Sequence, residues 1–257
     1  WITGPDNPLA ARVAVNHVWH RHFGRPIVDN LFDFGLRSPR PALGDVLDWL
    51  AVDFQEHGWS FKHLHRAIVT SRAYQLASSS PSELADRNRA VDPDNALHWK
   101  AELRRLEAEA VRDSVLAVSG SLDLTRGGPD IDYAEGEKNP RRSVYLRHAY
   151  EKQMTFLLLF DVASPNECYR RSESIVPQQA LALANSSLVH GNAEKLAKAM
   201  EGESADDFIA QIYERILGRS PWDEERAACR EFLQAGDHAR RDLIRVLMNH
   251  NDFVTVR

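Results

Sequence analysis

Polar side chains that can do chemistry occur at helical spacing in two stretches of the sequence. In the first stretch, Arg12, Asn16 and His20 are four residues apart, so they lie on one face of a helix, with Trp19 on the neighbouring ridge. Apolar residues flank the same face. We therefore expect these polar groups to point inward, where they can contribute to a buried site.

The second stretch carries the acidic candidates. Its charged residues lie three and four positions apart and can form a ladder of ion pairs on a helix: Arg105, Glu109, Arg112 and Asp113. If this helix packs against the first, Glu109 or Asp113 can act as a general acid or base while arginines orient an anionic or hydroxyl-rich ligand. Later parts of the chain add three further contributors: Arg171, Gln179 and Asn185.

The same residues also fit a structural role. Buried charges must be paired whatever their function, so ion pairs that tie loops to a helix bundle produce the same pattern. We favour this structural role for Glu109 and Asp113, and whether the chain is an enzyme stays open. If the site is functional, its ligand-binding residues are Arg12, Asn16, Trp19, His20, Arg105, Arg112, Arg171, Gln179 and Asn185.

Histidines near the first stretch raise the question of a metal site. His17 and His20 are one helical turn apart and can chelate, with His63 or His65 as further ligands. However, His22 points elsewhere, and no His-Glu-x-x-His pattern accompanies them. Histidines at the surface or at the edge of the core are the better explanation, so we predict no metal site.

Aromatic residues raise the alternative of a sugar-stacking surface. Trp49 and Trp59 lie next to apolar helix positions, so we expect them to pack in the core. Trp99 lies in a polar context and is the better candidate for exposure.

The composition is that of an ordinary globular protein. The 257 residues are 43% hydrophobic, enough for a sizeable core, and a net charge of -5 argues against a broad nucleic-acid footprint. No apolar run reaches membrane-spanning length. Cys168 and Cys229 are the only cysteines, so a four-cysteine zinc site is excluded and one disulfide is open. Because the chain begins at Trp1, we expect a fragment of a larger multidomain chain.

The elements that must position these residues are mostly helices. Capping residues and apolar spacing predict helices at 7–24, 42–57, 60–74 and 101–118, one from Pro177, and three beginning at Ser204, Ser220 and Asp237. The best strand candidate is 142–147. Segments rich in Gly, Pro, Ser and Asp predict long loops at 25–41, 77–95 and 123–140.

We therefore expect a mainly α fold. It is a multi-helix bundle of about eight to ten helices with long ordered loops and a small two-stranded β element. We expect a single domain over 1–257, with subdomains 1–77 and 95–257 as the alternative division.

Short motifs follow one another along nearly the whole chain. They include Asn7-Pro8-Leu9, Phe23-Gly24, Phe34-Gly35, Gly58-Trp59-Ser60, Arg104-Arg105-Leu106, Arg112-Asp113, Gly127-Gly128-Pro129, Val176-Pro177, Leu217-Gly218-Arg219 and Asn251-Asp252-Phe253. In these motifs and their order, the chain resembles the domain of unknown function 1553. Its members are planctomycete-type proteins that are often large, secreted and joined to c-type cytochrome modules.

The resemblance implies a role shared with neighbouring modules. It points to an extracytoplasmic module, periplasmic or secreted, that is linked to glycan processing or electron transfer. Its partners would be other modules of the same chain and a glycan, without nucleic acid or a membrane span. We expect no cofactor in this segment, and a haem would belong to a neighbouring module. Two alternatives stay open: a polysaccharide-active hydrolase or lyase that uses a carboxylate and arginines, and a structural scaffold.

Overall fold

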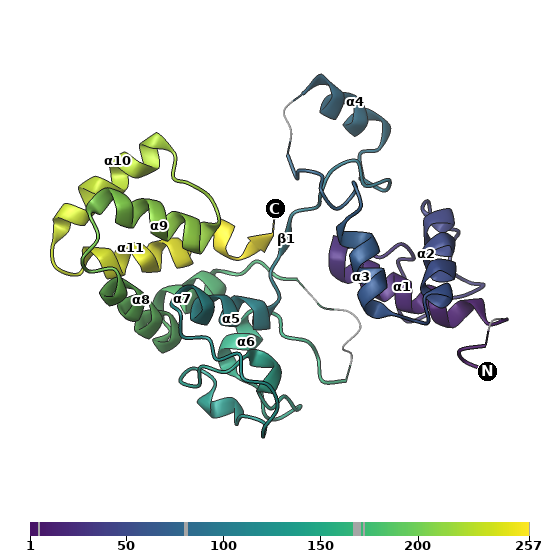
Figure 1. Cartoon of the computed structure of the whole chain (residues 1–257), viewed down its shortest axis with the longest axis horizontal. Coiled ribbons are helices and arrows are strands. Elements are labelled where there is room, and N and C mark those ends of the chain that lie inside the picture. Colours follow the sequence, from purple (N-terminus) through teal and green to yellow (C-terminus); the bar gives the residue numbers. More distant parts are fainter. Residues whose placement is uncertain (5, 80–81, 167–170, 172, 257) are drawn as a thin grey trace. The chain divides into compact units, whose positions relative to one another are not determined.

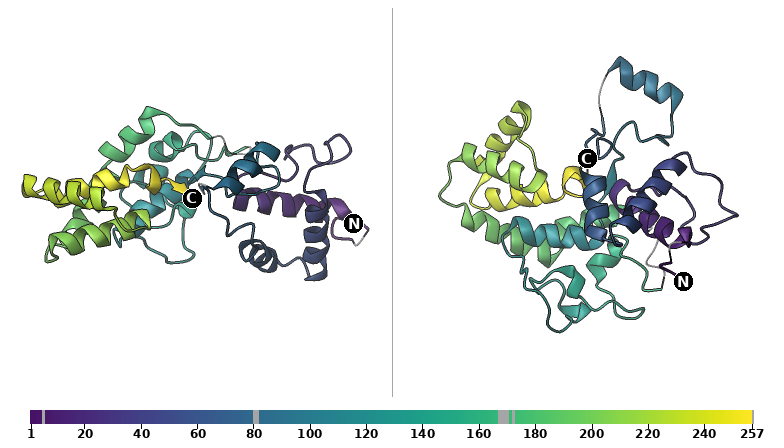
Figure 2. Two further views of the ribbon diagram at one scale, coloured as in Figure 1. Left: turned by 90° about the horizontal axis from the view of Figure 1, so that it is seen from above. Right: turned by 45° about the vertical axis from the view of Figure 1, so that its right-hand side comes forward.

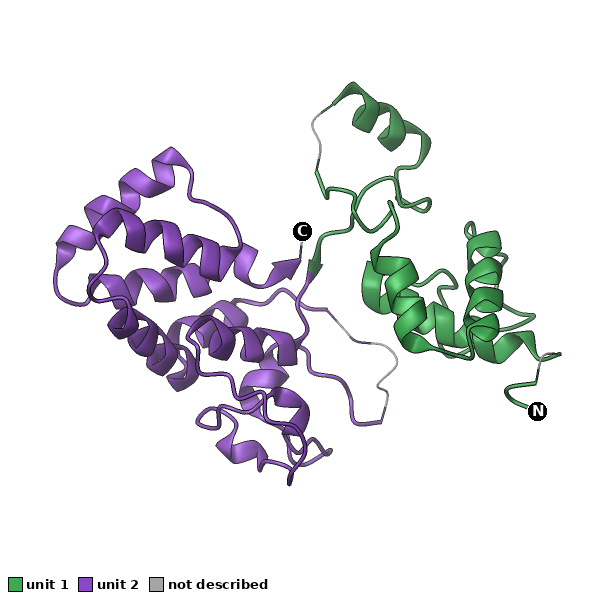
Figure 3. Cartoon of the chain, in the orientation of Figure 1, with its two compact units in different colours: residues 1–104, 257 green, residues 105–256 purple. Residues whose placement is uncertain are grey.

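The chain folds into a mainly α structure that consists of two compact units. The structure is a computed structural model and describes residues 1–4, 6–79, 82–166, 171 and 173–256. Unit 1 comprises residues 1–104 and unit 2 comprises residues 105–256, and each has its own hydrophobic core (Figure 3). The predicted fold class is confirmed, whereas the prediction of a single domain stays a prediction.

Unit 1 packs three helices around one core. These are α1 (Pro8–Phe23), α2 (Gly44–Glu56) and α3 (Phe61–Val69), which contact one another in pairs (Figure 1). The Asn7 side chain caps α1 by accepting a hydrogen bond from the Leu9 N–H, and Gly24 ends the helix at a φ of 76°. All three predicted helices are present, and the third ends at Val69, earlier than the predicted residue 74.

A fourth helix, α4 (Glu83–Val91), lies where the sequence predicts a surface loop. The Ser82 side chain caps it, and acidic residues occupy its first turn. Ala85 is the residue that it buries, so the helix has no apolar stripe for a periodicity argument to detect. The loop prediction is wrong at this point because capping, and not burial, marks the helix.

Unit 2 has the larger core, built by helices from both ends of the unit. Its helices are α5 (Ala108–Val118), α6 (Thr155–Leu159), α7 (Pro177–Asn185), α8 (Ser187–Ala199), α9 (Ala205–Leu217), α10 (Asp223–Phe232) and α11 (Ala239–Met248). Helix α11 packs on α8 and α9, and Figures 1 and 2 show these C-terminal helices side by side. Among the described residues there are thus eleven α-helices, more than the eight to ten expected.

The helix predicted at the start of unit 2 begins later than expected. The helix predicted over 101–118 begins at Ala108, and the residues before it form strand β1 (Arg104–Arg105), which pairs with β2 (Thr255–Val256). The Leu106 N–H extends this pairing by donating to the Val254 carbonyl at 2.8 Å. Arg105 therefore lies outside the helix, and the predicted ladder loses its first member.

The strand predicted over 142–147 is instead the short 3-10 helix η2 (Ser143–Tyr145). Ser143 is buried against Asp113, while Val144 is 69% exposed. A polar contact therefore decides the local conformation, and the two-stranded element forms elsewhere in the chain.

The separate cores lead to a prediction about cooperativity. Phe54 is fully buried in the core of unit 1, so Phe54→Ala should destabilise that unit by about 3–5 kcal/mol. Hydrogen exchange of the full chain should then show faster exchange in α1–α3 and unchanged protection in α8–α11.

Phe208→Ala is the matched control, since Phe208 is fully buried in the core of unit 2 and should give the opposite pattern. If either substitution lowers protection equally in both units, the chain unfolds as one cooperative domain and the two-unit description fails.

Candidate functional site

The predicted polar face of α1 meets two different environments. Asn16 is buried, and its amide donates to the Val28 carbonyl at 3.0 Å and accepts from the Val28 N–H at 2.9 Å. Arg12, one turn earlier, is partly exposed and pairs with Asp48 of α2 at 2.6 Å. Asn16 therefore holds the following loop against α1, and Arg12 is left at the surface of unit 1.

Trp19 and His20 also lie in different environments. Trp19 is buried, stacks on Phe23 with a centroid distance of 4.1 Å and meets the His98 ring edge-on at 5.5 Å. These contacts make Trp19 part of the core, whereas His20 is partly exposed at the helix surface.

The loop held by Asn16, the start of α2, and Leu9 and Arg12 of α1 line an open surface pocket of about 470 Å³, which we call the Arg12 pocket. Its polar lining is made by two arginines, two aspartates and a serine: Arg12, Arg40, Asp45, Asp48 and Ser38. Its apolar walls come from Leu9, Val28, Phe34, Leu36, Pro39, Pro41 and Leu47. The pocket thus combines apolar walls with charges of both signs.

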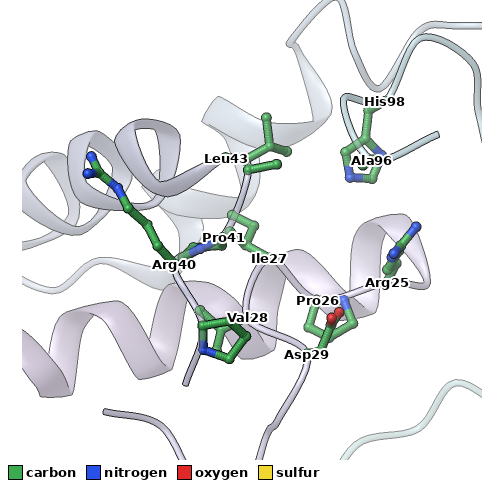
Figure 4. Close-up of a pocket in the computed structure, with 12 residues that line it drawn as sticks. Arg25, Pro26, Ile27, Val28, Asp29, Arg40, Pro41, Leu43, Ala96 and His98 are labelled. Atoms are coloured by element: carbon green, nitrogen blue, oxygen red, sulfur yellow. The ribbon is translucent and has the colours of Figure 1, made fainter. Parts of the chain in front are cut away.

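A smaller pocket of about 200 Å³ adjoins the first and shares Val28, Pro39, Arg40 and Pro41 with it. Figure 4 shows that Pro26 and Ile27 come from the segment after α1, while Ala96 and His98 come from a second segment that faces it. Both pockets therefore depend on the path of the loop that Asn16 holds.

His98 is presented by a tightly built turn. The Asp92 carboxylate accepts hydrogen bonds from the N–H groups of Ala96 and Leu97 at 2.9 and 2.8 Å, and the Asn95 amide donates to the Lys100 carbonyl at 3.0 Å. His98 itself has a φ of 52°, which is rare outside glycine. Burial lowers the pKa of its ring, so His98 is neutral at neutral pH and serves as a packing group beside Trp19.

In unit 2, Arg112 is completely buried and organises the loop between α5 and η2. Its guanidinium donates to the carbonyls of Gly136 at 2.7 and 3.0 Å, of Asn139 at 2.6 Å and of Arg141 at 2.9 Å, and to the Ser143 hydroxyl at 3.1 Å. It also donates to the neighbouring Asp113 carboxylate at 3.2 Å. The contacts with Gly136, Asn139 and Arg141 are all to main-chain carbonyls of the loop. Arg112 is therefore a loop anchor.

The two predicted catalytic carboxylates are both engaged. Asp113 accepts hydrogen bonds from the Ser143 N–H at 2.8 Å and the Ser143 hydroxyl at 2.6 Å. Glu109 pairs with both terminal nitrogens of Arg171, at 2.6 and 3.1 Å. Burial is the largest single influence and would raise the pKa of Glu109. The hydrogen bonds from Arg171, a main-chain hydrogen bond and the charges of Arg171 and His148 together outweigh burial and hold the pKa below its usual value. Glu109 is thus ionised at neutral pH and has no proton to give as a general acid.

The remaining predicted ligand-binding residues of unit 2 are scattered. Gln179 is buried and donates to the Ser174 carbonyl at 3.1 Å, while Asn185 is exposed at the end of α7. Arg105 is partly exposed on β1. The structure brings together Glu109 with Arg171 and Arg112 with Asp113, and the catalytic role of the two carboxylates stays a prediction.

Several residues of the pockets were not predicted from the sequence. Asp48 is one of them, although it lies three residues after Asp45 on the same helix, a spacing that marks a shared acidic face. Trp49 is 63% exposed, so the prediction that it packs in the core is wrong. Cys168, for which a disulfide with Cys229 is left open by the sequence, lies outside the described residues; burial raises the pKa of the Cys229 thiol.

Comparison with known families agrees with the order of the motifs. The family model described as a protein of unknown function, PSD1 (DUF1553), matches residues 1–233. The chain belongs to this family. The PSD1 match spans all of unit 1 and most of unit 2, and the predicted family is confirmed. No curated protein and no solved structure matches the chain.

The PSD1 family carries no assigned activity, so function must be argued from the residues themselves. None of the helices in the described part of this PSD1 member combines the length and apolar character needed to cross a lipid bilayer.

The Glu109–Arg171 pair leads to a prediction about pH. Because the folded-state pKa of Glu109 lies below its unfolded value, the pair stabilises the fold above that unfolded value and the contribution is lost as pH falls through the folded-state pKa. At pH 7, Glu109→Gln should lower the free energy of unfolding by roughly 1.5–3 kcal/mol. The difference from the wild-type chain should shrink below about pH 4.3.

Urea unfolding of both chains at pH 7 and at stepwise lower pH measures this difference. A gap that stays constant as the solution becomes acidic would show that the Glu109 charge is not what stabilises the pair.

Proposed function

We propose that this chain is a non-catalytic binding module and that the Arg12 pocket takes a neutral sugar unit of a glycan. The observation that carries the proposal is the Arg12–Asp48 ion pair, 2.6 Å long and partly exposed, in a pocket of about 470 Å³. This volume is within the range of small-ligand sites, about 300–1,000 Å³.

The charges of the pocket favour a neutral ligand with many hydroxyl groups. Arg12 and Arg40 balance Asp45 and Asp48, so the lining has no net charge. A nucleotide or other strong anion would meet two carboxylates, and a cation would meet two guanidinium groups. A sugar hydroxyl, in contrast, donates to a carboxylate and accepts from a guanidinium at the same time, so it can bridge the Arg12–Asp48 pair.

The apolar walls suit the remaining surface of a sugar. Phe34, Leu36 and Leu9 offer apolar area against which the C–H face of a pyranose ring can pack. Trp49 follows Asp45 by one helical turn, which brings its 63% exposed ring to the same face of α2. This ring can extend the contact to a second sugar unit.

The carboxylates support a binding role better than a hydrolase or lyase role. Glu109 is tied to Arg171 and Asp113 to Ser143, so each has a structural task. In this proposal unit 2 is the scaffold and unit 1 carries the ligand. The extracytoplasmic location, the link to glycan processing or electron transfer, and the haem on a neighbouring module belong to the same proposal; their support is the family resemblance.

The proposal predicts which substitutions weaken binding. Titration of the full chain with neutral gluco-, manno- and xylo-oligosaccharides should perturb NMR signals of Leu9, Phe34 and Leu36 for at least one of them. Arg12→Gln and Asp48→Asn should each weaken that binding roughly 10- to 150-fold, the loss of about 1.5–3 kcal/mol from a charged hydrogen bond. Both side chains are partly exposed, so the fold should be retained.

Arg37→Gln is the matched control. Arg37 belongs to the same loop and faces Asp33 at 3.4 Å, and neither residue lines the pocket. Binding should be unchanged in this variant. If no neutral oligosaccharide binds, if acidic oligosaccharides bind in preference, or if Arg12→Gln binds as the wild-type chain does, the proposal is refuted.

A further inference from the structure

We propose that Asp53, His57 and His63 form a binding site for a divalent transition-metal ion, with zinc as the best match. The three residues lie at the corner between α2 and α3, at the opposite end of α2 from the Arg12 pocket. Their candidate ligand atoms all lie within 4.8 Å of one another.

The ligand atoms are already near the spacing that a metal requires. The His63 Nε2 atom is 2.7 Å from Asp53 Oδ2, and the His57 Nδ1 atom is 3.2 Å from Asp53 Oδ1. Bonds of about 2.0–2.1 Å around tetrahedral zinc separate neighbouring ligand atoms by about 3.3 Å. An ion can therefore replace these hydrogen bonds once the His57 ring is reoriented. The His57 Nδ1 atom also lies 2.8 Å from the Asp53 main-chain oxygen, and this hydrogen bond is given up when the ring turns.

The backbone turns between the helices through two left-handed residues, and the path of this turn places His63 near Asp53. Gly58 and Trp59 both have left-handed backbone angles, with φ of 65° and 60°. For Trp59 this conformation is costly, and such strain persists only where the surroundings enforce it. The Trp59 ring packs on Phe54 with a centroid distance of 5.3 Å, and the Ser60 hydroxyl caps α3 at His63. The corner thus holds Asp53 and His63 on two packed helices.

The charge of the cluster also favours a cation. The Asp53 side chain is 16% exposed and faces two imidazoles, which supply no full positive charge in their neutral forms. A divalent ion would complete the pairing of this carboxylate. Two imidazole nitrogens and one carboxylate oxygen form a donor set typical of zinc sites with an open position, which a water molecule fills.

Metal binding requires the His57 ring to change its orientation, and this change can be measured. The His57 and His63 rings are stacked, with a centroid distance of 3.7 Å and an interplanar angle of 10°. A metal lies in the plane of each imidazole that it binds, so two parallel rings cannot share an ion. His57, whose side chain is 50% exposed, can turn out of the stack, and His63 can keep its place.

The test is a titration of the full chain at neutral pH with zinc chloride, followed by calorimetry, and with cobalt(II) chloride, followed by absorption. We expect one ion per chain and the visible bands of cobalt in a site with nitrogen and oxygen ligands. The ring-proton NMR signals of His57 should also move as the stack opens. Asp53→Asn, His57→Gln and His63→Gln should each weaken binding at least about ten-fold.

His22→Gln is the matched control. His22 lies 2.7 Å from His65 and forms a second close histidine pair in unit 1, so it reports whether any such pair binds the ion. Binding should be unchanged in this variant. His57→Gln keeps the test decisive if the less exposed positions disturb folding, because His57 is half-exposed. The proposal is overturned if no ion binds at one per chain, if His57→Gln binds as tightly as the wild-type chain, or if His22→Gln abolishes binding.

Discussion

Long loops in this protein are ordered because buried main-chain groups must find hydrogen-bond partners. In each unit, a buried polar side chain from a helix meets part of this requirement. In unit 1, Asn16 of α1 bonds both main-chain groups of Val28, and in unit 2, Arg112 of α5 bonds the carbonyls of Gly136, Asn139 and Arg141. The helices thus determine the paths of loops that have almost no secondary structure of their own.

This requirement gives polar residues at helical spacing a structural role. Asn16, Arg112 and Asp113 were candidates for chemistry because their spacing places them on helix faces that turn inward. In the structure, they form the contacts between helix and loop. In unit 1, these contacts also form the surface that can bind a ligand. The loop held by Asn16 supplies the walls around Arg12.

The helices could largely be predicted from the sequence, since their signals are local. Asn7 with Pro8, Ser60 and Ser204 begin helices, and Gly24 and Gly218 end them in left-handed conformations. Where a distant contact decides the conformation, local signals are insufficient. The start of α5 is an example, because Leu106 bonds to Val254, which is far along the chain.

The site could be predicted only in part, for the same reason. Arg12 and Asn16 were found from their spacing, but Asp48 is a partner of Arg12 only because α2 packs on α1. His63 was considered as a metal ligand, yet its partners Asp53 and His57 were not. Their proximity depends on the corner at Gly58 and Trp59, and no motif in the sequence describes that geometry.

The way in which Arg112 holds its loop has a consequence for evolution. Three of the groups that it bonds are main-chain carbonyls, which every amino acid provides. Side chains along this loop can therefore be exchanged by mutation without loss of the anchor, provided that Arg112 itself is kept. Gly136 is an exception, because a Cβ there would lie 2.5 Å from the Met154 sulfur. Relatives of this chain can thus diverge widely in this segment while the loop keeps its path.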